Sequence, residues 1–316
     1  NIPVPVPKDM EVLIKISGCG VCHTELDEIE GRIAPIVFPV VPGHQVVGIV
    51  TELGTGTSKF KIGDRVGVAW IYSACGLCKF CLDGKENLCD HFLATGKDVN
   101  GGYAEYMAVP EKYAHKIPEF FSDAEAAPLP CAGAIGYRSL RLAQLKDGDN
   151  VGLTGFGASA HLVLKILKYS YPKTKIFVFA RKEEERTFAK ELGAEWAGDT
   201  SNACPEKLDV IIDTTPAWKP VVEALANLKK GGRLVINAIR KEGTDKGYLQ
   251  NLNYQDHLWM EKEIKLTAKD VEDFLILAAN ASIRPEVQIF SLEEANKALF
   301  ELKERHVKGA KVLKIN

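Results

Sequence analysis

Hydrophobic and polar positions follow two different patterns along the chain. The first third carries short runs rich in Val and Ile, separated by Gly and Pro residues. Such runs are typical of antiparallel strands joined by long loops. The predicted strands are Glu11–Ile16, Val46–Glu52, Asp64–Ala69 and Tyr103–Val109. This part of the chain is therefore predicted to form a β-rich domain.

The pattern changes around Asp123–Ala132, where Ser122-Asp123-Ala124-Glu125 is a helix-start signal. Apolar strands then alternate with helices, which predicts parallel βαβ units. The strands are Asn150–Thr154, Lys175–Phe179, Val210–Asp213 and Arg233–Asn237, and the helices are Ser159–Tyr169, Glu183–Leu192 and Trp218–Leu228. After Asp270 we expect a helix, a strand near Glu286–Phe290, a helix over Leu292–Arg305 and a last strand, Ala310–Ile315. The predicted fold class is α/β, with a β-rich domain wrapped around an inserted, doubly wound parallel-sheet domain.

Two places in the sequence look incomplete. The chain opens at Asn1-Ile2-Pro3, without Met and directly before a strand-like run, so we expect that an N-terminal stretch is absent. At Leu266–Asp270 strand signals pass into helix signals with very little turn. We therefore expect that a loop has dropped out there.

Length and composition narrow the function classes. With 316 residues and 46% hydrophobic content, the chain can bury a large core and suits two domains. A net charge of -2, with acids and bases interspersed, argues against a nucleic-acid partner. No apolar run approaches the roughly 20 residues that span a bilayer, and no secretory signal pattern is present. Half of the eight cysteines form one cluster that needs reduced thiols, which predicts a cytoplasmic location.

That cluster consists of Cys75, Cys78, Cys81 and Cys89. Cysteines at this close spacing predict one tetrahedral zinc. The zinc would be structural, because four thiolates leave no open position for chemistry. The alternative is four unrelated buried cysteines.

A second motif follows the predicted strand Asn150–Thr154. The residues Gly155-Phe156-Gly157-Ala158-Ser159-Ala160 lead into an apolar helix, and another strand comes next. Gly155 permits a tight turn, Gly157 lets the backbone approach a pyrophosphate, and Ala160 fills the close-packing position of a dinucleotide-binding fingerprint. The alternative is a pair of packing glycines that bind no ligand.

The end of the next strand indicates which dinucleotide is preferred. An NAD site carries Asp or Glu there to bind the ribose hydroxyls, whereas this chain reads Phe179-Ala180-Arg181-Lys182. Arg181 can pair with a 2′-phosphate, so we expect NADP(H) to be favoured over NAD(H). The alternative is that Arg181 and Lys182 pair with Glu183–Glu185 on a solvated helix face.

Three further stretches carry candidate metal ligands. They are Cys19-Gly20-Val21-Cys22-His23-Thr24, Pro42-Gly43-His44 and Pro130-Cys131-Ala132-Gly133. Three protein ligands plus water is the arrangement of a catalytic zinc, and two Cys with one His is a recognised set. The chain therefore carries candidates for an open metal site besides the closed cluster.

Taken in order, these motifs resemble the zinc-dependent medium-chain alcohol dehydrogenases over essentially the whole chain. The matching motifs are CGVCHT, PGHQVVG, GDRV, CGLCKFC with its trailing Cys89, GGYAEY, PLPCAGAIGY and GFGASAH. The resemblance implies that Cys22, His44 and Cys131 bind a catalytic zinc, in addition to the structural one. It also implies a discontinuous GroES-like catalytic domain over residues 1–131 and 268–316, a Rossmann domain over 132–267, and a homodimer or homotetramer.

The resemblance further implies an alcohol or aldehyde substrate that exchanges a hydride with the nicotinamide while zinc polarises its oxygen. Thr24, two residues after Cys22, is placed to share a hydrogen bond with that oxygen and pass its proton outward. The alternative is an ordinary loop hydroxyl. His23 resembles the family position that contacts the cofactor pyrophosphate, and the alternative is a structural histidine. Cys19 is expected to be a buried packing residue.

Three residues near the expected metal depart from the family pattern. Gln45 stands where Glu is usual, so a carboxylate charge is lost. Glu25 stands where Asp is common and can still orient a ligand by the same hydrogen bonds. Asp27 stands where a His often ends the proton relay, so either Asp27 or water takes the proton.

Other functions fit parts of the sequence. Polyol dehydrogenases and cinnamyl-type aldehyde reductases share the ligand pattern and differ in the shape of the substrate pocket. Zinc-free quinone reductases and catalytically silent relatives lack both ligand sets. A redox sensor would use oxidation of the four-cysteine cluster as its switch. Two zinc ions per subunit would favour the dehydrogenase.

Overall fold

The computed structural model describes residues 2–36, 38–266, 271–304 and 308–315. The chain forms two compact units, Asn1–Cys131 with Val271–Asn316, and Ala132–Asp270. The two places at which the sequence looks incomplete, Asn1 and the seam at 267–270, lie outside the described residues. None of the described helices is both long and apolar enough to cross a membrane.

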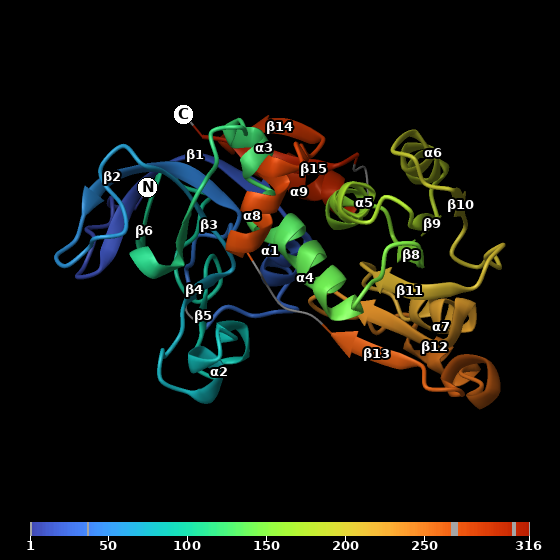
Figure 1. The fold of residues 1–316 in the computed structure, drawn as a ribbon. Coiled ribbons are helices and arrows are strands. Elements are labelled where there is room, and N and C mark those ends of the chain that lie inside the picture. Colours follow the sequence, from blue (N-terminus) through green and yellow to red (C-terminus); the bar gives the residue numbers. More distant parts are fainter. Residues whose placement is uncertain (1, 37, 267–270, 305–307, 316) are drawn as a thin grey trace. The chain divides into compact units, whose positions relative to one another are not determined.

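The first unit is organised around one mixed sheet that combines strands from both ends of the chain. Its order is β14-β15-β1-β2-β3-β7, and β6 also pairs with β1. Figure 1 shows the C-terminal strand β15 beside β1, and the two strands are antiparallel. The strands are β1 (Glu11–Val21), β2 (Val46–Leu53), β3 (Arg65–Val68), β6 (Tyr106–Pro110), β7 (Ala114–Lys116), β14 (Val287–Ser291) and β15 (Ala310–Lys314). Among the described strand pairs of this sheet, β14 and β15 are parallel and all others are antiparallel, so the predicted antiparallel β-rich domain is confirmed.

Apolar side chains from one face of this sheet form its core. Val12, Ile14 and Ile16 alternate along β1 and pack with residues of β2, β3 and β6 in one buried cluster. This period of two places Val12, Ile14 and Ile16 on the same face of the strand. The remaining elements are a two-stranded sheet of β4 (Ile71–Ser73) and β5 (Leu93–Ala94), and the helices α1 (His23–Ile29), α2 (Lys79–Leu82), α3 (Asp123–Ala126), α8 (Val271–Asn280) and α9 (Ala295–Lys303).

The second unit is a six-stranded sheet in which every described pair of strands is parallel. Its order is β10-β9-β8-β11-β12-β13, so the order reverses between β8 and β11, as in a Rossmann fold. The strands are β8 (Asn150–Thr154), β9 (Lys175–Phe179), β10 (Trp196–Gly198), β11 (Leu208–Asp213), β12 (Leu228–Ile236) and β13 (Glu263–Leu266). The helices are α4 (Ala134–Ala143), α5 (Ala158–Ser170), α6 (Glu183–Glu191) and α7 (Lys219–Asn227). The predicted doubly wound domain is therefore confirmed.

Strand β12 differs from its prediction. The strand was predicted over Arg233–Asn237, but it begins at Leu228 and contains Gly231 and Gly232. A register shift between Leu208 and Val210 of the neighbouring β11 accommodates the two glycines, and Gly231 has a φ of 68°. A bulge of this kind explains why glycine is tolerated inside the strand.

Candidate metal centres and cofactor site

The four cysteines of the closed cluster lie together beside α2. The Sγ atoms of Cys75, Cys78, Cys81 and Cys89 are all within 4.8 Å of one another. The Sγ of Cys81 is 3.6 Å from that of Cys78 and 3.9 Å from that of Cys75. Zn–S bonds of about 2.3 Å in a tetrahedron place the sulfur atoms about 3.8 Å apart, so these residues fit a zinc ion. Backbone N–H groups of Leu77 and Cys78 lower the pKa of Cys75 to about 6, which favours the thiolate that zinc binds.

Cys22, His44 and Cys131 form a second group of possible metal ligands. Their side-chain donor atoms all lie within 4.8 Å of one another, and Nε2 of His44 is 3.2 Å from Sγ of Cys131. Cys22 is the N-cap residue of α1, His44 precedes β2, and Cys131 lies in the helical turn Leu129–Gly133. This set of two sulfur atoms and one nitrogen fits zinc and leaves a fourth position for a substrate.

Glu25 holds two of these three residues in place. Its Oε2 accepts a hydrogen bond from the backbone N–H of Cys22 at 2.7 Å, and its Oε1 is 2.6 Å from Nδ1 of His44. Glu25 and His44 are both buried. Burial opposes the charged form of His44, but Glu25 and the Cys22 side chain raise its pKa to about 9. The glutamate thus orients Nε2 of His44 toward Cys131, so the additional methylene does not prevent this contact.

Thr24 and Trp70 lie against the same three-residue group. Oγ1 of Thr24 is 3.6 Å from Sγ of Cys22, and the side chain is 5% exposed. The ring of Trp70 meets that of His44 edge to face, with centroids 5.1 Å apart. His23 is the exposed first residue of α1. Cys19 is buried, as expected, and is not one of the three grouped residues.

The turn from β8 into α5 has the geometry that the glycine motif predicts. Gly155 has a φ of 77°, and a Cβ at this position would lie 2.8 Å from Oγ1 of Thr214. Gly157 is the N-cap of α5, and a Cβ there would meet no atom within 4 Å, so a ligand can approach its backbone. The helix begins at Ala158, and Ala160 is buried. The first N–H groups of the helix are available to bind a pyrophosphate.

Phe156 contributes to this turn through its backbone. Its side chain is buried and packs edge to face on Phe188, with ring centroids 5.6 Å apart. The aromatic ring therefore anchors the turn to the core of the second unit, while the flanking glycines remain at the surface of the turn.

The segment after β9 leaves Arg181 at the surface. Ala180 is buried and donates its N–H to Gly198 O at 2.9 Å, and Lys182 is the N-cap of α6. Arg186, rather than Arg181, pairs with Glu183, with an Nε–Oε2 distance of 3.0 Å. Arg181 is exposed, and within the described part of the chain its charge acts on Glu185, but no hydrogen bond or ion pair holds its guanidinium. This side chain therefore stays available for a ligand.

Comparison with known proteins identifies the family. Residues 8–119 match the alcohol dehydrogenase GroES-like domain. The chain is 40% identical to a probable alcohol dehydrogenase AdhA of Mycobacterium tuberculosis, over 99% of this chain and 91% of the relative. An alcohol dehydrogenase of Geobacillus stearothermophilus is 34% identical, over 98% of this chain and 93% of the relative. The chain belongs to the medium-chain alcohol dehydrogenase family.

Solved structures agree with this family assignment. A cinnamyl alcohol dehydrogenase of Sorghum bicolor superposes with a TM-score of 0.89 at 27% identity, covering 99% of this chain and 92% of that one. A Helicobacter pylori CAD complexed with NADP(H) gives 0.86 at 25% identity, covering 98% and 91%. The protein is therefore an oxidoreductase that acts on alcohols, in a family that generally uses zinc and a nicotinamide cofactor.

Asp27 and Gln45, which were expected to depart from the family pattern, are engaged in local contacts. Oδ1 of Asp27 accepts a hydrogen bond from Nε of Arg32 at 2.6 Å. Gln45 is buried, and a Cβ at Gly20 would lie 2.7 Å from its Oε1, so the amide lies against the backbone of β1. Neither side chain is a free surface group.

Sequence reasoning missed two buried polar groups near the candidate metal site. Glu28 is 4% exposed, and neither carboxylate oxygen has a hydrogen-bond partner among the described residues. Burial and the neighbouring charge of Glu25 raise the pKa of Glu28 to about 8. The hydroxyl of Tyr103 is likewise buried and unpartnered within the described part of the chain. The available signal was the three-residue spacing from Glu25 to Glu28, which puts both acids on one helix face.

Proposed function

We propose that this alcohol dehydrogenase is zinc-dependent and interconverts alcohols with aldehydes or ketones, with NADP(H) favoured over NAD(H). The observation that supports zinc dependence best is the grouping of the Cys22, His44 and Cys131 donor atoms within 4.8 Å. Residues far apart in sequence supply this set, and Glu25 binds two of its members. A purely structural role does not require two thiols and an imidazole to converge in this way.

The residues have distinct roles in this proposal. Cys22, His44 and Cys131 hold a catalytic zinc, which when bound acts as a Lewis acid on the substrate oxygen. Thr24 shares a hydrogen bond with the substrate oxygen and passes its proton outward during alcohol oxidation. Glu25 holds His44 in the tautomer that presents Nε2 to the metal. Cys75, Cys78, Cys81 and Cys89 hold a structural zinc that braces their loop.

The proton leaves Thr24 for water rather than for Asp27. The contact from Arg32 to Asp27 supports this choice, because a proton on Asp27 would remove the charge that holds Arg32. Alcohol oxidation would therefore release its proton to solvent without a side chain in the position of the usual relay histidine.

The nicotinamide dinucleotide binds at the turn between β8 and α5 in this proposal. The turn Gly155–Ala158 and the close-packed Ala160 let the pyrophosphate approach the N-terminus of α5, and His23 is a further pyrophosphate contact. Arg181 binds the 2′-phosphate, with Lys182 and the backbone at Ala180 beside it. The exposed guanidinium of Arg181 and the absence of an acid at the end of β9 support NADP(H).

A cinnamyl-type aldehyde reductase is the second candidate. Its support is the superposition on a cinnamyl alcohol dehydrogenase, with a TM-score of 0.89 at 27% identity. The chemistry would be the same and the substrate larger and aromatic. In either case we propose a cytoplasmic location, because the two ligand sets require reduced thiols. We also propose a homodimer or homotetramer, as the family resemblance implies.

Two measurements test the proposal. Metal analysis should find two zinc ions per subunit in the wild type and in Cys204→Ala, a control outside both ligand groups, but one in Cys131→Ala. Nicotinamide absorbance, followed with a panel of aliphatic and cinnamyl alcohols and aldehydes, should show faster turnover with NADPH than with NADH. One zinc in the wild type would refute the open site, a preference for NADH would refute the cofactor assignment, and no turnover would refute the activity.

A further inference from the structure

The second unit has a buried carboxylate at the C-terminal end of β11. Asp213 is the last residue of this strand and is fully buried. Its Oδ1 accepts hydrogen bonds from the Thr154 hydroxyl at 2.6 Å, the Thr215 hydroxyl at 2.7 Å and the Thr215 N–H at 3.2 Å. Its Oδ2 contacts the ammonium group of Lys241. A buried carboxylate is tolerated when its lone pairs are satisfied and a cation offsets its charge, and both conditions hold here.

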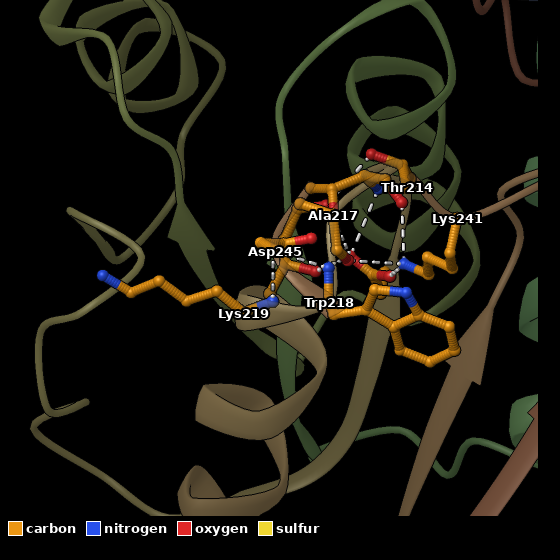
Figure 2. Close-up of polar contacts among 9 residues, drawn as sticks. Thr214, Ala217, Trp218, Lys219, Lys241 and Asp245 are labelled. Carbon is orange, nitrogen blue, oxygen red and sulfur yellow. Dashed lines mark hydrogen bonds and ion pairs between the residues drawn. The ribbon is translucent and has the colours of Figure 1, made fainter. Parts of the chain in front are cut away.

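Lys241 joins the segment after β12 to the segment after β11. Its side chain is 9% exposed, and besides Asp213 its ammonium donates to Thr215 O at 2.7 Å and Ala217 O at 3.1 Å. A lysine ammonium has three donors, so all of them are used. Figure 2 shows Lys241 beside the loop that contains Ala217, with dashed lines from its ammonium group.

A second contact holds the far end of the same loop. Oδ2 of Asp245 accepts hydrogen bonds from the N–H groups of Trp218 and Lys219, each at 2.8 Å, at the start of α7 (Figure 2). Between these points the N–H of Glu242 donates to Pro216 O at 2.7 Å. Residues 214–218 are thus fixed along their length by the segment that contains Lys241.

The fixed loop packs directly against the glycine turn of the dinucleotide site. The N–H and the hydroxyl of Thr214 both donate to Thr154 O, each at 3.0 Å. A Cβ at Gly155 would lie 2.8 Å from Oγ1 of Thr214 and 2.9 Å from Cγ2 of Thr215, so no atom fits between loop and turn. The contact lies where β8 and β11 are neighbours, at the reversal of strand order that marks the ligand crevice of such sheets.

We propose that Lys241 is a positioning residue for the dinucleotide site. Its ammonium holds Asp213 and the carbonyl of Thr215, which keeps the loop from Thr214 against Gly155 and the turn in the conformation that receives the pyrophosphate. Lys241 acts through these residues, without touching the reacting atoms. This inference rests on the proposed function, because it assumes that a nicotinamide dinucleotide binds at the Gly155 turn.

The test compares NADPH binding by wild type, Lys241→Met and a matched control, Lys229→Met. Lys229 of β12 pairs with Asp209 of β11 at 2.7 Å, near the end of β11 opposite to Asp213. Isothermal titration should give a Kd for NADPH that is raised on the order of ten-fold in Lys241→Met and unchanged in Lys229→Met. Steady-state kinetics should show a raised KM for NADPH with kcat changed by less than about two-fold, since positioning by Lys241 affects binding.

The double variant Asp213→Asn with Lys241→Met is included because the single variant Lys241→Met leaves a buried charge and can fail to fold. It leaves no unpaired buried charge, yet still lacks the donors to Thr215 and Ala217, so its Kd should also rise. A lowered melting temperature with an unchanged Kd in either folded variant would overturn the proposal, because Lys241 would then have a structural role only. Absence of NADPH binding by the wild type would instead refute the cofactor site itself, and with it this role.

Discussion

Replacing Glu28 by glutamine removes the ionisable group from a buried side chain while keeping its size. Neither oxygen of Glu28 has a hydrogen-bond partner in the described structure, and the side chain is 4% exposed. Burial is the main reason why the pKa of Glu28 rises from 4.5 to about 8, and the negative charge of Glu25 is the second. A buried carboxylate without partners should therefore cost the folded protein stability whenever it is ionised.

The sign of the effect follows from comparing the folded and unfolded states. Below pH 4.5 Glu28 carries a proton in both states, so wild type and Glu28→Gln should be about equally stable. Between pH 4.5 and about 8 the unfolded state loses this proton first, so wild type loses stability relative to the variant as the pH rises. The stability contribution of the protonated group is thus present at low pH and lost by about pH 8.

The size of the effect can be bounded. At about 1.36 kcal/mol per pKa unit, the difference between 4.5 and about 8 corresponds to at most about 5 kcal/mol. Because relaxation and water penetration recover part of such a penalty, we expect about 2–3 kcal/mol at pH 9. For domains of 150–250 residues this corresponds to a melting temperature higher by roughly 4–12 °C in the variant. Zinc at Cys22, His44 and Cys131 adds two positive charges but displaces two thiol protons, so the net charge near Glu28 does not rise.

Thermal unfolding followed by circular dichroism at pH 5, 7 and 9 measures the difference between the two proteins. Glu184→Gln is the matched control, because Glu184 is exposed on α6 and its replacement should change the free energy of unfolding by less than about 0.5 kcal/mol at every pH. A Glu28→Gln difference that stays constant from pH 5 to pH 9, whatever its sign, would show that Glu28 does not titrate abnormally in the folded protein.

Other substitutions test the remaining site assignments. Arg181→Ala should raise the KM for NADPH on the order of ten-fold and leave the KM for NADH unchanged, because the charged pair with the 2′-phosphate is lost. Steady-state kinetics with each cofactor measure both values, and an equal rise in the two KM values would contradict this role. Thr24→Val should lower kcat on the order of 100-fold or more at unchanged zinc content, and a wild-type kcat would exclude a proton-transfer role. Gln45→Glu should change turnover or ligand exchange, and identical rates across pH would count against a role for this position. Cys89→Ser should lose one zinc ion per subunit by metal analysis and lower the melting temperature; retention of two ions would remove Cys89 from the ligand set.

The elements that follow from local periodicity could be predicted closely. The helix predicted over Ser159–Tyr169 is observed as Ala158–Ser170, and the strand Asn150–Thr154 has the predicted bounds. The short strand β10 and the strand β13 were not predicted. Each lies at an edge of the sheet and pairs with one neighbour, so its place depends on that neighbour more than on its own three or four residues. A short stretch of sequence carries no information about such a neighbour, so these two strands could not be predicted from it.

In the candidate site, the metal ligands could be predicted from residue type, whereas the residues that orient them depend on the folded environment. Cysteine and histidine at suggestive spacings identify possible ligands, because few other side chains bind zinc. The pairings from Asp213 to Lys241 and from Glu25 to His44 connect segments distant in sequence, and acids and lysines are also the commonest surface residues. Folding, rather than residue type, gives these side chains their roles, so they could not be separated from solvated charges beforehand.

The buried acids around the candidate catalytic site suggest why residue 45 is an amide in this chain. Glu25 is buried within hydrogen-bonding distance of His44, and Glu28 is buried nearby, where the charge of Glu25 raises its pKa. A carboxylate next to His44 would add a third acid to the same poorly solvated region, and like charges there disfavour one another's ionisation. With an amide at position 45, the region holds two acids instead of three, so Glu25 orients His44 while Glu28 stays neutral near pH 7.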